Sequence, residues 1–156
     1  MPVKKIKQLL DEHKVKYVVL SHSPAYTAQE VAALTHIPGK ELAKTVMIKI
    51  DNTLAMLVLP ASYRVNFEML KENTGAKKVE LASEEEFKYS FPDCEIGAMP
   101  PFGNLYGMQV LVAESLTDDE DIAFNAGSHR ELVKMKYRDF EKLINPKIVK
   151  SSVQFA

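Results

Sequence analysis

A lysine and a rigid loop carry the chemistry that this sequence offers. Lys44 opens an apolar run within residues 42–50, and a loop rich in glycine and proline spans residues 97–103. A lysine at the entrance of a strand can keep its ammonium at a pocket rim while the sheet holds its stem. The prolines fix φ beside permissive glycines, so the backbone can aim N–H groups at an oxygen. Together they indicate a site for an anionic or carbonyl-bearing ligand, although an ordinary edge lysine and an ordinary turn explain the two features equally well.

The four histidines differ in what their positions indicate. His129 follows the small residues Gly127 and Ser128 in a turn, where a side chain can point into a pocket; a site role and a structural role are equally supported. His22 precedes Ser23-Pro24, and a hydrogen-bonded turn histidine is favoured there over a ligand contact. His13 and His36 lie near expected helix ends and are expected to do no chemistry.

Several classes of chemistry lack the residues that they need. The sequence has no HExxH spacing and no cluster typical of metal ligands, so no metal or other cofactor is expected. No serine stands in a GxSxG motif, and Cys94 has no basic neighbour in sequence to activate it. The acidic runs 84–86 and 118–121 are expected to be solvated or to lie at helix starts. Metal-assisted and covalent catalysis are therefore not expected.

Composition limits the class of protein. The chain has 156 residues, 46% of them hydrophobic, which is enough to bury roughly two-thirds of the unfolded surface around one core. A net charge of -1 does not favour nucleic-acid binding by bulk electrostatics, so any RNA contact should be local. A single cysteine excludes an internal disulfide framework. No apolar run approaches the roughly 20 residues of a membrane span, and the first residues lead into a polar helix. We expect one cytoplasmic domain over residues 1–156, with no membrane association.

The elements that must position these residues can be predicted from periodicity and capping signals. Thr27 with Glu30, and Ser83 with Glu86, are typical of capping boxes at helix starts, and Asn66 is typical of an N-cap. We expect helices at residues 3–13, 27–36, 66–75, 83–90 and 137–144. Short runs rich in β-branched residues predict strands at residues 17–20, 45–50, 53–60, 77–81, 109–113, 122–125 and 131–135. The tail after Pro146 gives no clear pattern.

The order of these elements predicts the fold class. Residues 45–60 should form a β-hairpin around Asp51-Asn52, and the second strand, apolar on both faces, should be central. Strands outnumber helices without regular βαβ alternation. We therefore expect an α+β domain with a curved mixed β-sheet or partial barrel flanked by helices.

Four short motifs in one order resemble a known family. The chain resembles the YbaK/ProX family of aminoacyl-tRNA deacylases, which is related to the inserted editing domain of bacterial prolyl-tRNA synthetase. The motifs cover nearly the whole chain: Ser21-His22-Ser23-Pro24-Ala25-Tyr26-Thr27-Ala28-Gln29-Glu30, Leu42-Ala43-Lys44-Thr45, Gly97-x-x-x-Pro101-Phe102-Gly103 and Gly127-Ser128-His129.

The resemblance implies roles for particular residues. Lys44 matches the family's functional lysine, residues 97–101 its GxxxP loop, and His129 the histidine of the prolyl-type editing members. It implies catalysis by Lys44, Gly97, Pro101 and His129, with Lys44 holding the tRNA end and the loop backbone receiving an oxyanion. The candidate substrate-binding residues are His22, Thr45, Ala98, Met99, Gly127 and Ser128.

The resemblance also implies a substrate and partners. It implies metal-free hydrolysis, in trans, of the ester of mischarged aminoacyl-tRNA, most closely alanyl-tRNA for proline, with prolyl-tRNA synthetase as a further partner. A pocket too small for proline but open to alanine would act as a second sieve, since one methylene in a synthetase pocket gives only about 1 to 3 kcal/mol of discrimination. Two alternatives stay open: a deacylase for Ser, Thr or Cys on tRNA, and a non-catalytic module that binds tRNA or a synthetase.

Overall fold

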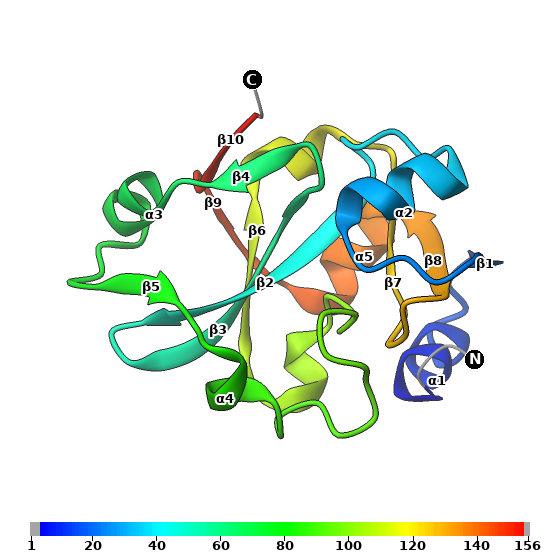
Figure 1. Cartoon of the computed structure of the whole chain (residues 1–156), viewed down its shortest axis with the longest axis horizontal. Coiled ribbons are helices and arrows are strands. Elements are labelled where there is room, and N and C mark those ends of the chain that lie inside the picture. The colour runs from blue at the N-terminus through cyan, green and yellow to red at the C-terminus, as the bar shows by residue number, and fades with distance from the viewer. Residues whose placement is uncertain (1–3, 155–156) are drawn as a thin grey trace.

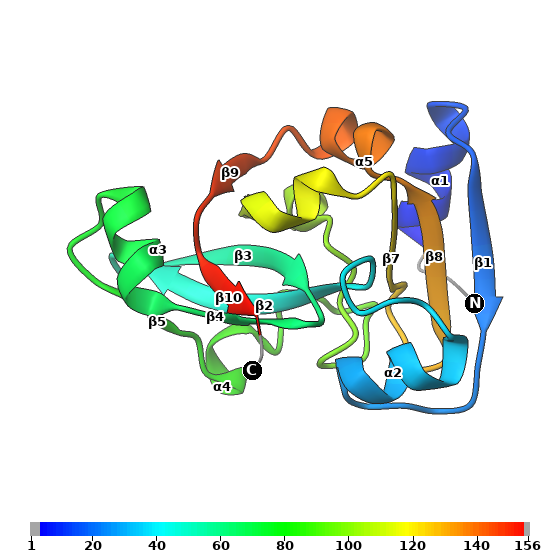
Figure 2. The same cartoon turned by 90° about the horizontal axis from the view of Figure 1, so that it is seen from above.

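The computed structural model describes residues 4–154, and for Ala28 and Gln29 the backbone alone. Figure 1 shows the whole chain and Figure 2 the view from above. The α-helices of the described part are α1 (Lys4–Glu12), α2 (Ala28–Thr35), α3 (Phe67–Thr74), α4 (Glu84–Phe87) and α5 (Tyr137–Ile144), with 3-10 turns η1 (Gly103–Tyr106) and η2 (Glu114–Asp118). Val3, the expected first residue of the first helix, lies outside the described residues.

The strands form three sheets. In chain order they are β1 (Tyr17–Ser21), β2 (Ala43–Ile50), β3 (Thr53–Pro60), β4 (Tyr63–Val65), β5 (Val79–Leu81), β6 (Gln109–Ala113), β7 (Asp121–Asn125), β8 (Glu131–Lys136), β9 (Lys147–Val149) and β10 (Ser152–Gln154). The largest sheet has the order β5-β2-β3-β6-β9, with β3, β6 and β9 parallel and the rest antiparallel. A second sheet, β1-β8-β7, is antiparallel, and β10 pairs with β4. The predicted α+β class with a mixed sheet is confirmed, and the sheets described are open.

Local sequence chemistry explains many of the element boundaries. The Thr27 side chain accepts a hydrogen bond from the Glu30 N–H, and the Asn66 side chain accepts one from the Met69 N–H, as the capping signals predict. The capping box of Ser83 and Glu86 also forms. Asp51 and Asn52 both have positive φ, 48° and 70°, in the tight turn of the predicted β2–β3 hairpin. As expected, β3 lies inside its sheet.

The two larger sheets lie side by side, and backbone contacts join them. Leu42, just before β2, forms an isolated parallel bridge with Ala123 in β7. The Ala123 N–H donates to the Glu41 carbonyl over 2.9 Å. The start of β2 is thereby fixed beside the middle of β7.

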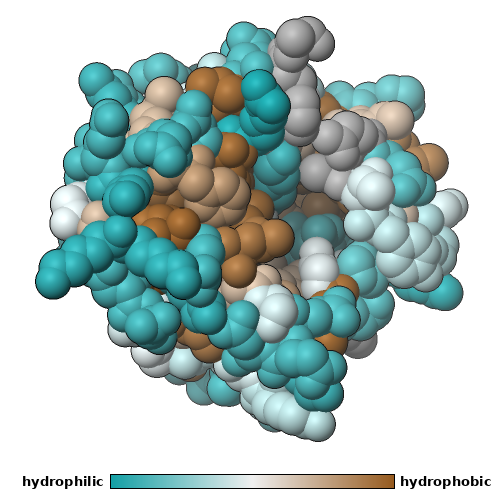
Figure 3. Space-filling model, turned by 60° about the vertical axis from the view of Figure 1, so that its left-hand side comes forward, coloured by the Kyte–Doolittle hydropathy of each residue, from teal (hydrophilic) through white to brown (hydrophobic). Residues whose placement is uncertain are grey.

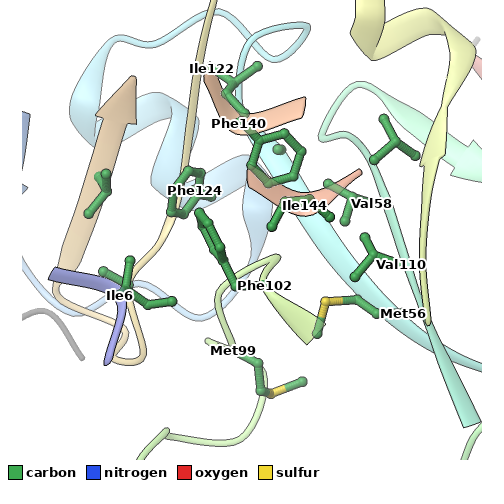
Figure 4. Close-up of a cluster of buried hydrophobic side chains, with 14 of the residues drawn as sticks. Ile6, Met56, Val58, Met99, Phe102, Val110, Ile122, Phe124, Phe140 and Ile144 are labelled. Carbon is green, nitrogen blue, oxygen red and sulfur yellow. The ribbon is translucent and has the colours of Figure 1, made fainter. Parts of the chain in front are cut away.

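An aromatic cluster fills the core between the sheets and α5 (Figure 4). Phe102, Phe124 and Phe140 are fully buried, with ring centroids 5.4, 5.5 and 6.2 Å apart in the three pairs. Phe102 directly follows the loop at residues 97–101. The core therefore anchors the end of that loop.

The surface carries hydrophobic groups on one face. In Figure 3, hydrophobic side chains gather beside a hollow near the middle of the face, and hydrophilic side chains surround them.

In the part of the chain that the structure describes, no helix is long and apolar enough to cross a membrane.

Replacing Phe102 by alanine should lower the free energy of unfolding by about 3 to 5 kcal/mol, because the substitution leaves a cavity in the aromatic cluster. Urea denaturation followed by circular dichroism measures this loss. Phe87→Ala is the matched control, since Phe87 is only partly buried against the same cluster, and its loss should be clearly smaller. Equal losses in the two variants would contradict the anchoring role of Phe102.

Candidate active site

A cavity of about 170 Å³ lies where four distant segments meet. Leu42, Ala43, Lys44 and Thr45 line it from the start of β2. Gly97 and Met99 line it from the predicted loop. Tyr26 and Val31 come from the start of α2, and Asn125 comes from the end of β7. The structure therefore brings together parts of three of the four motifs and Asn125, which lies just before the fourth, although these segments span a hundred residues of sequence.

Backbone hydrogen bonds hold these segments in place. The Gly127 N–H donates to the Ala98 carbonyl over 2.9 Å, and the Glu95 N–H donates to the Gly127 carbonyl over 2.7 Å. Gly127 has φ of 99°, a conformation that glycine adopts without strain. The loop at residues 95–98 is thus tied to the turn between β7 and β8.

Lys44 places a cationic group at the cavity wall. Its side chain is half-buried, and desolvation lowers the pKa of its ammonium below the ordinary lysine value. Strand β2 fixes its backbone, because Lys44 pairs with Leu59 in the hairpin. A partly desolvated ammonium attracts an anionic or carbonyl oxygen more strongly than a fully hydrated one does.

The loop at residues 97–101 has its N–H groups engaged in two ways. The Gly97 N–H donates to the Met99 Sδ over 3.1 Å, and the Ala98 N–H donates to the Glu95 carbonyl over 3.1 Å. A thioether is a weak acceptor, so a ligand oxygen can replace it at the Gly97 N–H.

Ala98 and Pro101 are buried and do not line the cavity. Pro101 leads the chain to the Phe102 anchor instead.

His129 lies behind the cavity wall and has a fixed orientation. Its ring is only 8% exposed, and Nε2 lies 2.9 Å from the Ile96 carbonyl oxygen, to which it donates. The other ring nitrogen, Nδ1, is buried and has no hydrogen-bond partner among the described residues. A Cβ built on Gly97 would lie 3.4 Å from the His129 Cε1 atom. His129 therefore supports the loop from beneath Gly97.

The remaining predicted residues lie around the site rather than in it. The Ser128 hydroxyl accepts from the Arg130 N–H, and the His22 Nδ1 lies 2.6 Å from the Ser23 carbonyl oxygen. Neither residue lines the cavity.

Burial raises the pKa of the Cys94 thiol to about 11, so the thiol stays protonated at neutral pH. Within residues 4–154, no group of three or more His, Cys, Asp or Glu side chains is arranged to hold a metal ion.

Sequence reasoning did not select two polar residues that line the cavity, Tyr26 and Asn125. The Asn125 Oδ1 atom is buried and has no hydrogen-bond partner in the described part of the chain. Tyr26 is 70% exposed, although it borders the cavity. Tyr26 stands within the first motif and Asn125 two residues before the fourth, yet nothing in their spacing indicates that they share one cavity.

The fold and this site define a class of protein. The sequence pattern of the aminoacyl-tRNA editing domain matches residues 22–143, and the chain belongs to that family. This confirms the resemblance that the four motifs indicate.

Individual relatives agree with this assignment. The chain is 35% identical over 83 residues to a proline–tRNA ligase of Bacillus cereus strain AH187, and 32% identical over 83 residues to one of Bacillus cytotoxicus. Each match covers 53% of this chain and 14% of the ligase, so the chain spans a small part of the curated relatives' length.

Solved structures share the fold. A candidate trans-editing enzyme for prolyl-tRNA synthetase superposes with a TM-score of 0.79 at 17% identity, covering 97% of this chain and 96% of that one. A hypothetical protein superposes with a TM-score of 0.83 at 20% identity, covering 96% of this chain and 100% of that one.

Replacing Gly97 by alanine should strain the loop, because Gly97 has φ of 88°. We expect a loss of stability of about 1 to 2 kcal/mol and a shift of the His129 Cε1–H resonance, measured by thermal melts and NMR.

Gly107→Ala is the matched control for this effect. Gly107 has φ of 75°, and a Cβ added there would meet no described heavy atom within 4 Å beyond its chain neighbours. Its variant should lose similar stability and leave the His129 resonance in place. An unchanged resonance in Gly97→Ala would show that His129 does not support the loop.

Proposed function

We propose that this chain hydrolyses the ester bond of mischarged aminoacyl-tRNA, and that alanyl-tRNA for proline is its preferred substrate. The observation that carries the proposal is that Lys44 and Gly97, which lie far apart in sequence, line one small cavity in a member of the editing family. We further propose that residues 1–156 act as one editing domain, in trans and in the cytoplasm, on tRNA charged by prolyl-tRNA synthetase.

The size of the cavity supports a small amino acid. In another protein an engineered cavity of about 150 Å³ binds benzene, so 170 Å³ holds about six non-hydrogen atoms, which is about the size of an alanyl ester. A prolyl ester adds a ring that the buried walls at Val31, Leu42 and Met99 would have to accommodate. Selection is therefore steric, as a second sieve requires.

Asn125 offers a contact for the amino group of the substrate. Its Oδ1 atom is covered by protein in the empty site, and a turn of the side chain toward the cavity would let it accept a hydrogen bond from the α-ammonium group. A buried acceptor without a partner is unfavourable until such a donor arrives. The aminoacyl group would thus be held by its ammonium at Asn125.

Lys44 and Gly97 act at the two ends of the ester. Lys44 attracts the phosphate or ribose oxygens of the acceptor end and so places the ester in the cavity. Water, positioned by the neighbouring ribose hydroxyl, adds to the carbonyl carbon and gives up one proton to bulk water, and a tetrahedral oxyanion forms. The Gly97 N–H, released from the Met99 sulfur, donates to that oxygen. Collapse of this intermediate breaks the bond to the ribose oxygen, which takes up a proton from bulk water, and frees the amino acid.

His129 contributes by positioning the loop. Its hydrogen bond to the Ile96 carbonyl fixes the peptide that carries the Gly97 N–H. An oxyanion donor works only if its direction is set before the reaction, because reorientation during the reaction would raise the barrier. No metal takes part in this scheme.

The decisive test of this function mixes the protein with alanyl-, seryl-, threonyl-, cysteinyl- and prolyl-tRNA and measures ester loss with and without EDTA. We expect alanyl-tRNA to be hydrolysed fastest, prolyl-tRNA to persist, and EDTA to have no effect. Lys44→Met should lower kcat/KM by about a hundredfold or more and leave the thermal melt nearly unchanged, because methionine avoids the desolvation that Lys44 undergoes.

The matched control is Lys71→Met, which removes an exposed lysine of α3 that does not line the cavity. Its activity should equal that of the wild type. If no ester is lost, the enzyme hypothesis is wrong and a non-catalytic tRNA-binding module is favoured. Faster hydrolysis of another aminoacyl-tRNA would contradict the proposal that alanyl-tRNA is the preferred substrate. Inhibition by EDTA would contradict the metal-free scheme.

A second prediction concerns Asn125. Asn125→Leu should raise KM for alanyl-tRNA by roughly 10- to 100-fold with kcat little changed, because a hydrogen bond to a charged group contributes about 1.5 to 3 kcal/mol. Asn125→Asp keeps the acceptor oxygen and should retain binding. Lactyl-tRNA, which carries a hydroxyl in place of the ammonium, should respond much less to Asn125→Leu. Equal losses on both esters would show that Asn125 does not hold the ammonium.

A further inference from the structure

Tyr26 is an exposed aromatic residue with a fixed position. Its side chain is 70% exposed, and it borders a cavity whose other lining residues are buried or half-buried, except for the exposed Gly97. One side of its ring packs on His129, with ring centroids 4.7 Å apart and the planes tilted by 44°. His129 is itself fixed by its hydrogen bond to Ile96. The exposed part of Tyr26 therefore rests on a rigid support.

The backbone on both sides of Tyr26 is also fixed. Before it, Ala25 is fully buried and its N–H donates to the His129 carbonyl over 3.1 Å. After it, Thr27 caps α2 by accepting from the Glu30 N–H over 3.1 Å. Little conformational freedom remains for Tyr26 to lose when a ligand binds, so the gain from contact is not offset by ordering.

The cavity is exposed at Tyr26 and Gly97, so the rest of the substrate leaves it along the edge that these two residues form. Room for about six non-hydrogen atoms holds an aminoacyl group, but not the nucleoside to which it is esterified. The ribose and terminal base then lie outside, at the rim. Among the residues that line the cavity, Tyr26 is the exposed aromatic one, and aromatic rings are the common platform for unpaired bases.

We propose that Tyr26 stacks on the terminal adenine of the tRNA acceptor strand and so positions the ester over the cavity. This inference rests on the proposed function, because the ligand is the end of an aminoacyl-tRNA. Stacking depends on the flat face of the base and needs no large basic surface, which agrees with a net charge of -1. Tyr26 is a positioning residue in this scheme, while Lys44 and Gly97 contact the reacting group.

A binding experiment tests the proposal without any hydrolysis. The chain contains no tryptophan, so Tyr26→Trp introduces a single indole whose fluorescence reports stacking. We expect saturable quenching by the trinucleotide CCA and none by the same trinucleotide with an abasic 3′ residue. Tyr89→Trp is the control, since Tyr89 is 83% exposed and does not line the cavity; it should show no quenching. No quenching of Tyr26→Trp, or equal quenching by the abasic probe, would overturn the proposal.

A kinetic experiment separates stacking from support of His129. Tyr26→Leu should raise KM for alanyl-tRNA by roughly 5- to 150-fold with kcat little changed, while Tyr26→Phe and Tyr89→Leu should keep the wild-type value. An alanyl ester of ribose, which has no base, should be hydrolysed equally by wild type and Tyr26→Leu. An equal fall in kcat on both esters would show that Tyr26 only supports His129. If the wild type hydrolyses no ester, the proposed function fails, and the quenching result still decides the stacking.

Discussion

Two backbone hydrogen bonds through Gly127 hold the loop at residues 95–98 against the turn between β7 and β8. Without them the loop would be joined to this end of the fold mainly through Phe102 and the hydrogen bond from His129 to Ile96, and Gly97 and Met99 would be placed less firmly beside Lys44. The positive φ of Gly127 lets both its N–H and its carbonyl meet the same loop. The same turn places His129 beneath Gly97. The cavity is therefore a consequence of how a loop is attached, and the sheets supply its fixed outer walls.

The site differs from the core because it places polar groups in partly buried positions. The aromatic cluster of Phe102, Phe124 and Phe140 is fully buried and contains no polar atom. At the cavity, burial lowers the pKa of Lys44, and the Asn125 Oδ1 has no partner within residues 4–154. Each of these features is unfavourable for folding alone. Such local exceptions are expected where a surface is prepared for a ligand, because a ligand donor would meet the Asn125 Oδ1 and a ligand anion would favour the charged form of Lys44.

The sequence predicts those parts of the structure that depend on local chemistry. The caps at Thr27 and Asn66 and the Asp51-Asn52 turn each act over a few residues, and all are confirmed. The strands β4, β9 and β10 are three residues long, and they pair with partners far away in sequence, so no local pattern indicates them. In the site, too, some residues are indicated by the local sequence and others only by contacts between distant segments. Motif order indicated Lys44 and the loop, whereas Tyr26 and Asn125 become candidates only when the fold brings them to one cavity.

The small amino acid that we propose as the substrate of this chain presents a difficulty for binding. The methyl group of alanine buries little apolar surface, so it contributes little binding energy, and the cavity can reject larger side chains more readily than it can hold this one. Affinity must then come from groups that every aminoacyl-tRNA shares: the ammonium, the acceptor-end oxygens and the terminal base. Asn125, Lys44 and Tyr26 border the cavity with chemistry suited to these three groups. In this scheme binding is general, and selectivity comes from the volume left for the side chain.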